Sequence, residues 1–226
     1  TKDTIQYNAL SKITGKGLLT ADGDLWFRNR RLQQPAFVRP RLVRLDEVVI
    51  PAAQQMMEQW QTAMQRGEAV DIDAAMMRLA LTVVGQAMFG VNLAEDATEL
   101  TEATMTTLDH IIYLTRNPIS PPEWFPTAEN RKFRTALTRL DAAIAALIAR
   151  RRLAKEPKED LLGMLLAAQT QADPPLTEQQ LRDELITILV AGHETVASAL
   201  TWSWYLLAKH PAEWQTLHHE VRTALQ

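Results

Sequence analysis

The chain has 226 residues, of which 46% are hydrophobic and 23% charged, a composition typical of a globular protein with a real core. Its net charge of −3 argues against a general nucleic-acid-binding protein. Because it contains no cysteine, these residues form neither a disulfide framework nor a thiolate metal site. The chain starts at Thr1 rather than Met, so an upstream leader or membrane anchor stays open, while a cytoplasmic location is favoured.

The first predicted long helix carries an aromatic–basic pair. Asp22 or Asp24 can cap a helix that ends before Pro35. On it Trp26 and Arg30 lie four residues apart and share a face. The indole and the guanidinium are hydrogen-bond donors only, so the pair suits a carboxylate. An ordinary cation–aromatic pair at the surface is the alternative.

A basic cluster overlaps this helix in an otherwise slightly acidic protein. It consists of Arg28, Arg30, Arg31, Arg39, Arg41 and Arg44. Such a run is typical of a solvated face, and the second interpretation is steering of an acidic protein partner. A nucleic-acid role is not favoured, because aromatic residues do not alternate with the arginines and the net charge is negative.

The middle of the chain predicts three amphipathic helices, over residues 41–65, 73–89 and 95–115. Gly67 and Gly90 follow the first two as stop signals, and Asp73 can cap the second. The apolar stripe of the first helix consists of Leu42, Leu45, Val49, Ala52, Met56, Trp60 and Met64. The residues expected to face inward on the second are Met76, Leu79, Val83 and Ala87.

Residues 116–126 contain four prolines and are not expected to form a helix. One interpretation is a rigid turn whose Trp124 and Phe125 pack on the core. Thr127 can then cap a helix that extends to about Lys155, and a short helix follows over residues 159–171.

The longest helix is predicted between Leu176 and Pro211. Thr177 and Gln180 form a capping box, Leu176 can pack against Leu181 as a hydrophobic staple, and Pro211 ends the run. About 32 residues at about 1.5 Å each give a helix about 48 Å long. Because it is apolar nearly all round, we expect a buried central helix rather than a membrane span, since charged residues interrupt it.

Gly192, His193, Glu194 and Thr195 interrupt this apolar run near its centre. A glycine inside a helix costs about 1 kcal/mol relative to alanine. A glutamate in apolar surroundings is costly unless it is paired or protonated. Thr195 can bond back to the carbonyl of Ala191 and bend the helix. The cluster therefore indicates a site; the alternative is that His193 and Glu194 face a solvated edge and Thr195 is a satisfied core residue.

The segment Ala191-Gly192-His193-Glu194-Thr195 resembles the A-G-x-D/E-T motif on the central helix of the cytochrome P-450 monooxygenases. The W-x-x-x-R of Trp26 and Arg30, followed by Pro35 and Phe37, is similar to the early helix of that family beside the heme edge. The resemblance implies a mainly α fold with a long buried central helix surrounded by amphipathic helices. It also implies that residues 1–226 are an incomplete single domain, the central part of that fold.

The resemblance implies a heme-dependent monooxygenase that inserts one oxygen atom of O2 into a lipophilic substrate such as a fatty acid, terpene or steroid. Glu194 and Thr195 would deliver protons to dioxygen at the heme. Ala191, Gly192 and Thr195 would border the cofactor, and Trp26 and Arg30 would hydrogen-bond a propionate. Electrons would come from NAD(P)H through a ferredoxin, flavodoxin or reductase docked at the basic cluster. We expect a monomer, with residues 116–126 as a mobile lid over substrate access.

The departures from the family are the missing axial cysteine and the missing E-x-x-R pair. We therefore expect an internal fragment that lacks the N-terminal region and the C-terminal part, and that is inactive by itself. A zinc-protease reading fails because H-E-x-x-H needs histidine where Ala197 stands. The alternative function is a non-enzymatic, all-helical binding or scaffold module.

Overall fold

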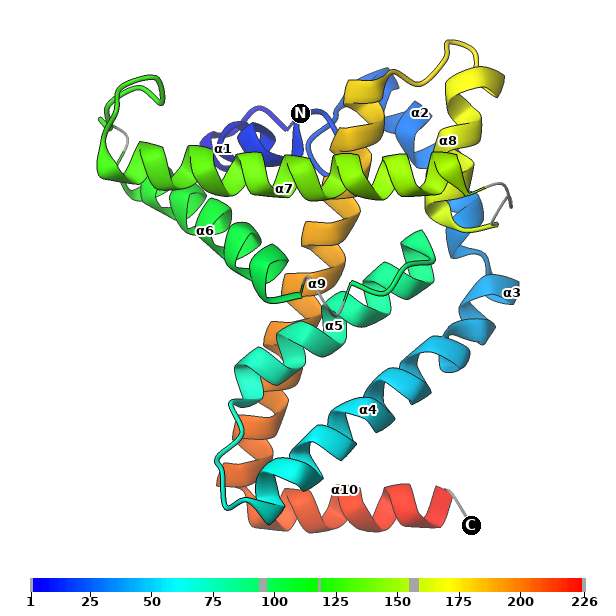
Figure 1. The fold of residues 1–226 in the computed structure, drawn as a ribbon, viewed down its shortest axis with the longest axis vertical. Helices are drawn as coiled ribbons and strands as arrows, with labels where there is room; N and C mark the ends of the chain where they lie inside the picture. The colour runs from blue at the N-terminus through cyan, green and yellow to red at the C-terminus, as the bar shows by residue number, and fades with distance from the viewer. Residues whose placement is uncertain (1, 94–96, 118, 155–158, 225–226) are drawn as a thin grey trace.

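The computed structural model describes residues 2–93, 97–117, 119–154 and 159–224, and within these ranges it contains helices and no strand (Figure 1). The mainly α fold class is thereby confirmed. The helices are α1 (Ile5–Thr14), α2 (Gly23–Gln33), α3 (Arg39–Leu42), α4 (Asp46–Gln65), α5 (Ile72–Phe89), α6 (Ala97–Arg116), α7 (Ala128–Leu153), α8 (Leu161–Gln171), α9 (Glu178–Lys209) and α10 (Pro211–Ala224). Short 3₁₀ turns occupy Gln34–Phe37 and Val43–Leu45.

Helix α9 is the element on which the others pack. It contacts α1, α5, α7, α8 and α10, and α7 crosses its N-terminal half, with α6 alongside α7 (Figure 1). The predicted capping box is confirmed, because Thr177 accepts from the Gln180 backbone and the Gln180 side chain accepts from the Thr177 backbone. Leu176 and Leu181 of the expected staple are both buried in the main core.

Helix α9 was expected to be buried along its length, but it is buried only in its N-terminal half. Leu181, Leu185 and Leu189 are at most 1% exposed, whereas Trp202 and Leu206 are 62% and 50% exposed. The main core gathers α1, α7 and α8 around the first half of the helix, while α4, α5 and α10 cover one side of the second half. Apolar composition alone therefore did not identify which part of the helix is covered.

Helix α5 differs from the sequence prediction in its cap and in its buried face. Its N-cap is Asp71, whose side chain accepts from the Ala74 N–H, and not Asp73, which lies in the first turn. The helix ends at Gly90, as predicted, and the structure shows this glycine in the left-handed conformation. Of the four residues expected to face inward only Met76 is buried; the buried face consists of Met76, Met77, Ala80, Leu81, Thr82, Val84, Gly85 and Phe89. The face shifts because α5 packs along α9 on one side and α4 on the other.

The prediction of a single helix over residues 41–65 is wrong. The structure divides it into α3, a 3₁₀ turn and α4, and α4 itself includes Pro51. Of the predicted apolar stripe only Ala52 is buried, and Met64 is 73% exposed. Helix α4 packs mainly against α5, so much of its apolar stripe has no neighbouring helix among the described residues.

The proline-rich connection between α6 and α7 is non-helical over its described residues, as expected. Trp124 and Phe125 are 75% and 49% exposed, so the interpretation that they pack on the core is wrong. The turn is fixed by Asn130 of α7, whose side chain donates hydrogen bonds to the carbonyls of Pro122 and Phe125. Thr127 caps α7 as predicted, and the predicted limits at Glu95 and Lys155 lie outside the described residues.

By length and composition alone, two of the described helices, α5 and α9, would suffice to cross a membrane. They pack against each other in the core. Core helices of soluble proteins pass the same test, so the observation carries little weight.

Candidate functional site

The predicted catalytic residues lie where α9 emerges from the core. Ala191 and Thr195 are exposed and, being four residues apart, share one face of the helix. Among the described residues Thr195 makes no side-chain hydrogen bond, so the bond back to Ala191 considered above does not form. Glu194 is half-buried, and its carboxylate likewise has no hydrogen-bond or ion-pair partner in the described part of the chain. The helix thus presents a hydroxyl and, about 100° around its axis, a carboxylate, and neither group has a partner in the described part of the chain.

His193 lies on the opposite side of the helix from this face. It is 0% exposed, and its Nε2 lies 3.5 Å from Thr101 Oγ1 of α6. Burial lowers the pKa of His193, and the nearby Met77 carbonyl partly opposes this by favouring the protonated ring. The alternative with His193 on a solvated edge and Thr195 in the core is therefore wrong for both residues. At about 100° per residue the two side chains are well separated around the helix.

Gly192 has a packing role of its own. A Cβ built at this position would lie 2.9 Å from Val84 Cγ2 of α5. At the present approach of α5 and α9, a larger residue here would force Val84 or one of the helices to shift. This contact accounts for glycine at position 192 independently of any cofactor, and the role of Gly192 beside a cofactor stays a prediction.

Trp26 and Arg30 share a face of α2 and form the cation–aromatic pair that was the alternative in the sequence analysis, while their binding of a carboxylate stays a prediction. The Arg30 guanidinium lies 5.4 Å from the centre of the Trp26 ring, and Lys2 Nζ lies 5.8 Å from it. Arg30 is exposed and has no ion-pair partner among the described residues. The indole thus carries two cations beside it, which makes the surroundings favourable for an incoming carboxylate.

A buried polar network joins α2 to α9, and sequence analysis missed it. Glu184 of α9 is 1% exposed; its Oε2 accepts from the Leu18 N–H at 2.9 Å and from Gln33 Nε2 of α2 at 2.6 Å. Its neighbour Asp183 accepts from the Lys16 N–H at 2.9 Å. The signal in the sequence was an adjacent Asp–Glu pair inside the apolar run of the central helix.

Burial raises the pKa of Glu184 to about 7, and the two hydrogen bonds from Leu18 and Gln33 only partly offset it. Three buried oxygens of the network have no partner in the part of the chain that the structure describes: Asn29 Oδ1, Gln33 Oε1 and Glu184 Oε1. All three are acceptors, so a protonated Glu184 supplies the donor that this environment lacks. The network holds the 15–18 turn and α2 against α9, and thereby fixes the Trp26–Arg30 pair relative to the central helix. No direct contact between that pair and residues 191–195 is present in the described chain.

Several arginines of the basic cluster already form local contacts. Arg28 donates to the Pro174 carbonyl, Arg41 pairs with Glu159 and Arg44 pairs with Glu47. Arg31 and Arg39 are exposed and have no ion-pair partner among the described residues. The free positive charge is therefore smaller than the arginine count suggests.

The fold and these residues define a class of helical proteins built on one long core helix with a polar break. The sequence model of the family described as Cytochrome P450 matches residues 1–226, and the chain belongs to that family.

The chain is 32% identical over 216 residues to cyclooctatin synthase of Streptomyces melanosporofaciens, covering 94% of this chain and 46% of that protein. It is 30% identical to LUTEIN DEFICIENT 5, a chloroplastic protein of Arabidopsis thaliana, over 96% of this chain and 39% of that protein. It is 28% identical to pentalenene oxygenase of Streptomyces avermitilis, over 99% of this chain and 49% of that protein. The chain thus spans half or less of the length of these relatives.

Family membership implies heme, and the residues of this chain fit part of its requirements. The cations around Trp26 suit the carboxylates of the cofactor edge. The exposed face of α9 has small residues at Ala191, Thr195 and Ala199, against which a flat group can lie. The described residues contain no cluster of metal ligands, and the chain has no cysteine for an axial thiolate.

Proposed function

We propose that the protein containing this chain is a heme-dependent monooxygenase that inserts one oxygen atom of O2 into a lipophilic substrate. Heme, when bound, supplies the reductive activation of dioxygen, with electrons that come from NAD(P)H through a redox partner. The observation that carries the proposal is the polar break of α9, at the end of the buried half of the helix, where Thr195 is exposed and Glu194 is half-buried and neither side chain has a partner among the described residues.

Glu194 and Thr195 have complementary roles in moving protons. A hydroxyl can donate one hydrogen bond while accepting another, so Thr195 can pass a proton across the exposed face of α9. Glu194 is half-buried, so its carboxylate can exchange protons with solvent and hand them to the hydroxyl or to a bridging water. Both residues are fixed by a helix whose preceding turns are buried, which limits the reorganisation that proton transfer would otherwise require.

The residues of this chain that would hold the cofactor come from two helices. Trp26 and Arg30 would donate to a heme propionate, and the tether from Gln33 to Glu184 would keep them in register with α9. Ala191 and Gly192 would leave room beside Thr195 on the cofactor side. We further propose that residues 1–226 are the central part of one catalytic domain. The axial cysteine and E-x-x-R would then lie in the remainder, and the isolated segment would be inactive.

The proposed substrate rests on the names of related proteins, and the proposed partner rests on the exposed charges of this chain. Relatives are called pentalenene oxygenase and carotene epsilon-monooxygenase, which agrees with a lipophilic substrate for this protein as well. Arg31 and Arg39, which have no ion-pair partner among the described residues, are the cations that an acidic electron donor (a ferredoxin, flavodoxin or reductase) would contact. A monomer in the cytoplasm is the simplest arrangement.

Two measurements on the full-length protein test this proposal. The carbon monoxide difference spectrum should show a heme–thiolate signal, and its absence would favour the alternative of a non-enzymatic helical module. Thr195→Ala should retain the heme spectrum but divert reducing equivalents to peroxide, measured as product formed per NAD(P)H consumed.

Thr201→Ala is the matched control, because Thr201 lies on the same helix and its hydroxyl already bonds to Asp73. Its coupling of electron use to product should equal that of the wild type. Equal coupling in Thr195→Ala would remove Thr195 from the proton path.

A further inference from the structure

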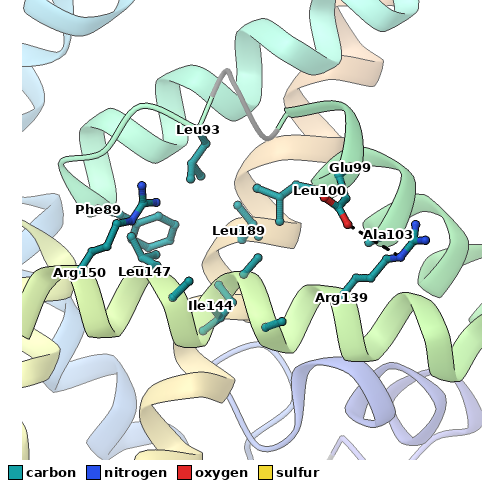
Figure 2. Close-up of a pocket in the computed structure, with 13 residues that line it drawn as sticks. Phe89, Leu93, Glu99, Leu100, Ala103, Arg139, Ile144, Leu147, Arg150 and Leu189 are labelled. Atoms are coloured by element: carbon teal, nitrogen blue, oxygen red, sulfur yellow. Dashed lines mark ion pairs between the residues drawn. The ribbon is translucent and has the colours of Figure 1, made fainter.

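A pocket lies between α7, the end of α5 and the start of α6, with Leu189 of α9 in its wall (Figure 2). It has a volume of about 430 Å³ and is formed by the end of α5, the first turns of α6, the middle of α7 and Leu189 of α9. Leu189 precedes Ala191 by two residues and so points to nearly the opposite side of the helix, about 200° around it. The pocket is therefore separate from the proposed oxygen side.

The walls of this pocket are apolar and already packed into the core. The six large wall residues are at most 5% exposed: Phe89, Leu93, Leu100, Ile144, Leu147 and Leu189. A mostly apolar recess of this size, with few polar groups at its edge, is typical of small-molecule binding sites.

The rim along α7 has a regular pattern. Arg139, Ala143, Ala146 and Arg150 are spaced by four, three and four residues, so they form one stripe along the helix. The arginines stand at the two ends of the pocket, about 16 Å apart along the axis at about 1.5 Å per residue (Figure 2). The alanines between them leave a shallow apolar trough.

The two arginines differ in their charge environment. Arg139 forms an ion pair with Glu99 of α6 at 3.9 Å. The Arg150 guanidinium has no hydrogen-bond or ion-pair partner among the described residues, although the adjacent Arg151 is buried and paired with Asp160. One end of the trough thus carries a neutralised pair and the other end a free, planar cation.

We propose that this pocket binds one amphipathic anion, an alkyl carboxylate of the fatty-acid type. Its carboxylate pairs with Arg150, whose planar guanidinium matches a carboxylate with two parallel hydrogen bonds. Its alkyl chain follows the alanine trough over the apolar walls toward Arg139. Arg150, which is unpaired among the described residues, sets the sign of the ligand charge, and the apolar lining sets the nature of its tail.

The test uses the full-length protein and dodecanoate, whose extended chain has about the length of the trough. Binding is measured by calorimetry, beside dodecanol and dodecyltrimethylammonium as neutral and cationic analogues. A dodecanoate analogue with a photoreactive group near the chain end is then cross-linked, and the labelled peptides are identified by mass spectrometry. The cross-link distinguishes this pocket from the heme side, where a lipophilic acid could also bind.

We expect labelling within residues 89–103 or 139–150, and dodecanoate should bind more tightly than either analogue. Arg150→Gln should weaken the binding about fivefold or more, and Ala146→Trp, an exposed position, should fill the trough and abolish labelling while the circular dichroism spectrum is unchanged. Arg134→Gln, an exposed arginine of α7 outside the pocket, should bind as the wild type does.

Labels outside these two segments, equal affinities of Arg150→Gln and Arg134→Gln, or equal binding of the ammonium analogue would each overturn the proposal. These results do not depend on monooxygenase activity, so the pocket and the proposed function can fail separately.

Discussion

Replacement of the buried Glu184 by glutamine should change how the stability of the protein depends on pH. The folded structure raises the pKa of this carboxyl from 4.5 to about 7, mainly through burial. At about 1.4 kcal/mol per pKa unit, this difference corresponds to about 3 kcal/mol. Because Glu184 is 1% exposed, solvent screening reduces this figure little.

The sign follows from proton binding. Between pH 4.5 and about 7 the folded state holds a proton on Glu184 that the unfolded state has released, so the free energy of unfolding falls as pH rises. This loss of unfolding free energy is complete above the pKa of Glu184 in the folded state. Neighbouring Asp183 adds to the raised pKa, while Arg28 and the bonds from Leu18 and Gln33 oppose it.

Glu184→Gln removes this titration and keeps the shape of the side chain. Its amide can still accept from the Leu18 N–H, and its NH2 group supplies a donor to the unpartnered amide oxygens of Asn29 or Gln33. Relative to the wild type, the variant should therefore gain about 2 to 3 kcal/mol in unfolding free energy between pH 5 and pH 8. Urea unfolding of the full-length protein, followed by circular dichroism at several pH values, measures this difference.

The matched control is Glu178→Gln in the first turn of the same helix. Glu178 is exposed, and its hydrogen bond from Arg152 lowers its pKa, so it is ionised in both states above pH 5. Its stability difference from the wild type should not change with pH over this range. Parallel pH profiles for the wild type and Glu184→Gln would refute the reasoning.

Three further substitutions test the packing and the cofactor contacts. Gly192→Ala should destabilise the protein in urea unfolding, because overpacking of its Cβ against Val84 (about 1 to 3 kcal/mol) exceeds the gain of about 1 kcal/mol in helix propensity, and in a Val84→Ala background the same change should become stabilising. The double variant Trp26→Ala with Arg30→Ala should retain less heme after gel filtration, measured as heme per protein, and normal heme content would remove the pair from the cofactor site. Arg151→Met should lower the unfolding free energy by about 3 kcal/mol, since it leaves a largely buried carboxylate without its partner, and a loss below 1 kcal/mol would contradict this.

Local signals in the sequence predicted helix ends well and helix surroundings poorly. The Thr177–Gln180 capping box, the Thr127 cap and the helix end at Gly90 were all found where the sequence placed them. These features depend on hydrogen bonds within one turn of the chain. The exposed stripe of α4 was not foreseen, because its burial depends on which helices lie beside it.

In the candidate site, too, local features were predicted from the sequence and long-range contacts were not. The resemblance suggested Thr195 and the Trp26–Arg30 pair as site residues, and the shared face of that pair followed from helical spacing alone. The tether through Glu184 was not predicted, because its partners Leu18 and Gln33 are 166 and 151 residues away along the chain. The rim of the pocket was likewise hidden, since its arginines look like ordinary charges on a solvated helix.

The sequence by itself determined where the central helix begins and ends and that a polar break lies at its middle. Only the tertiary structure decided that His193 faces inward and Thr195 outward, and that a larger residue at Gly192 would meet Val84. The physical reason is that capping and helix formation satisfy hydrogen bonds between neighbours in the chain. Burial instead depends on packing by distant segments, which sequence periodicity does not specify.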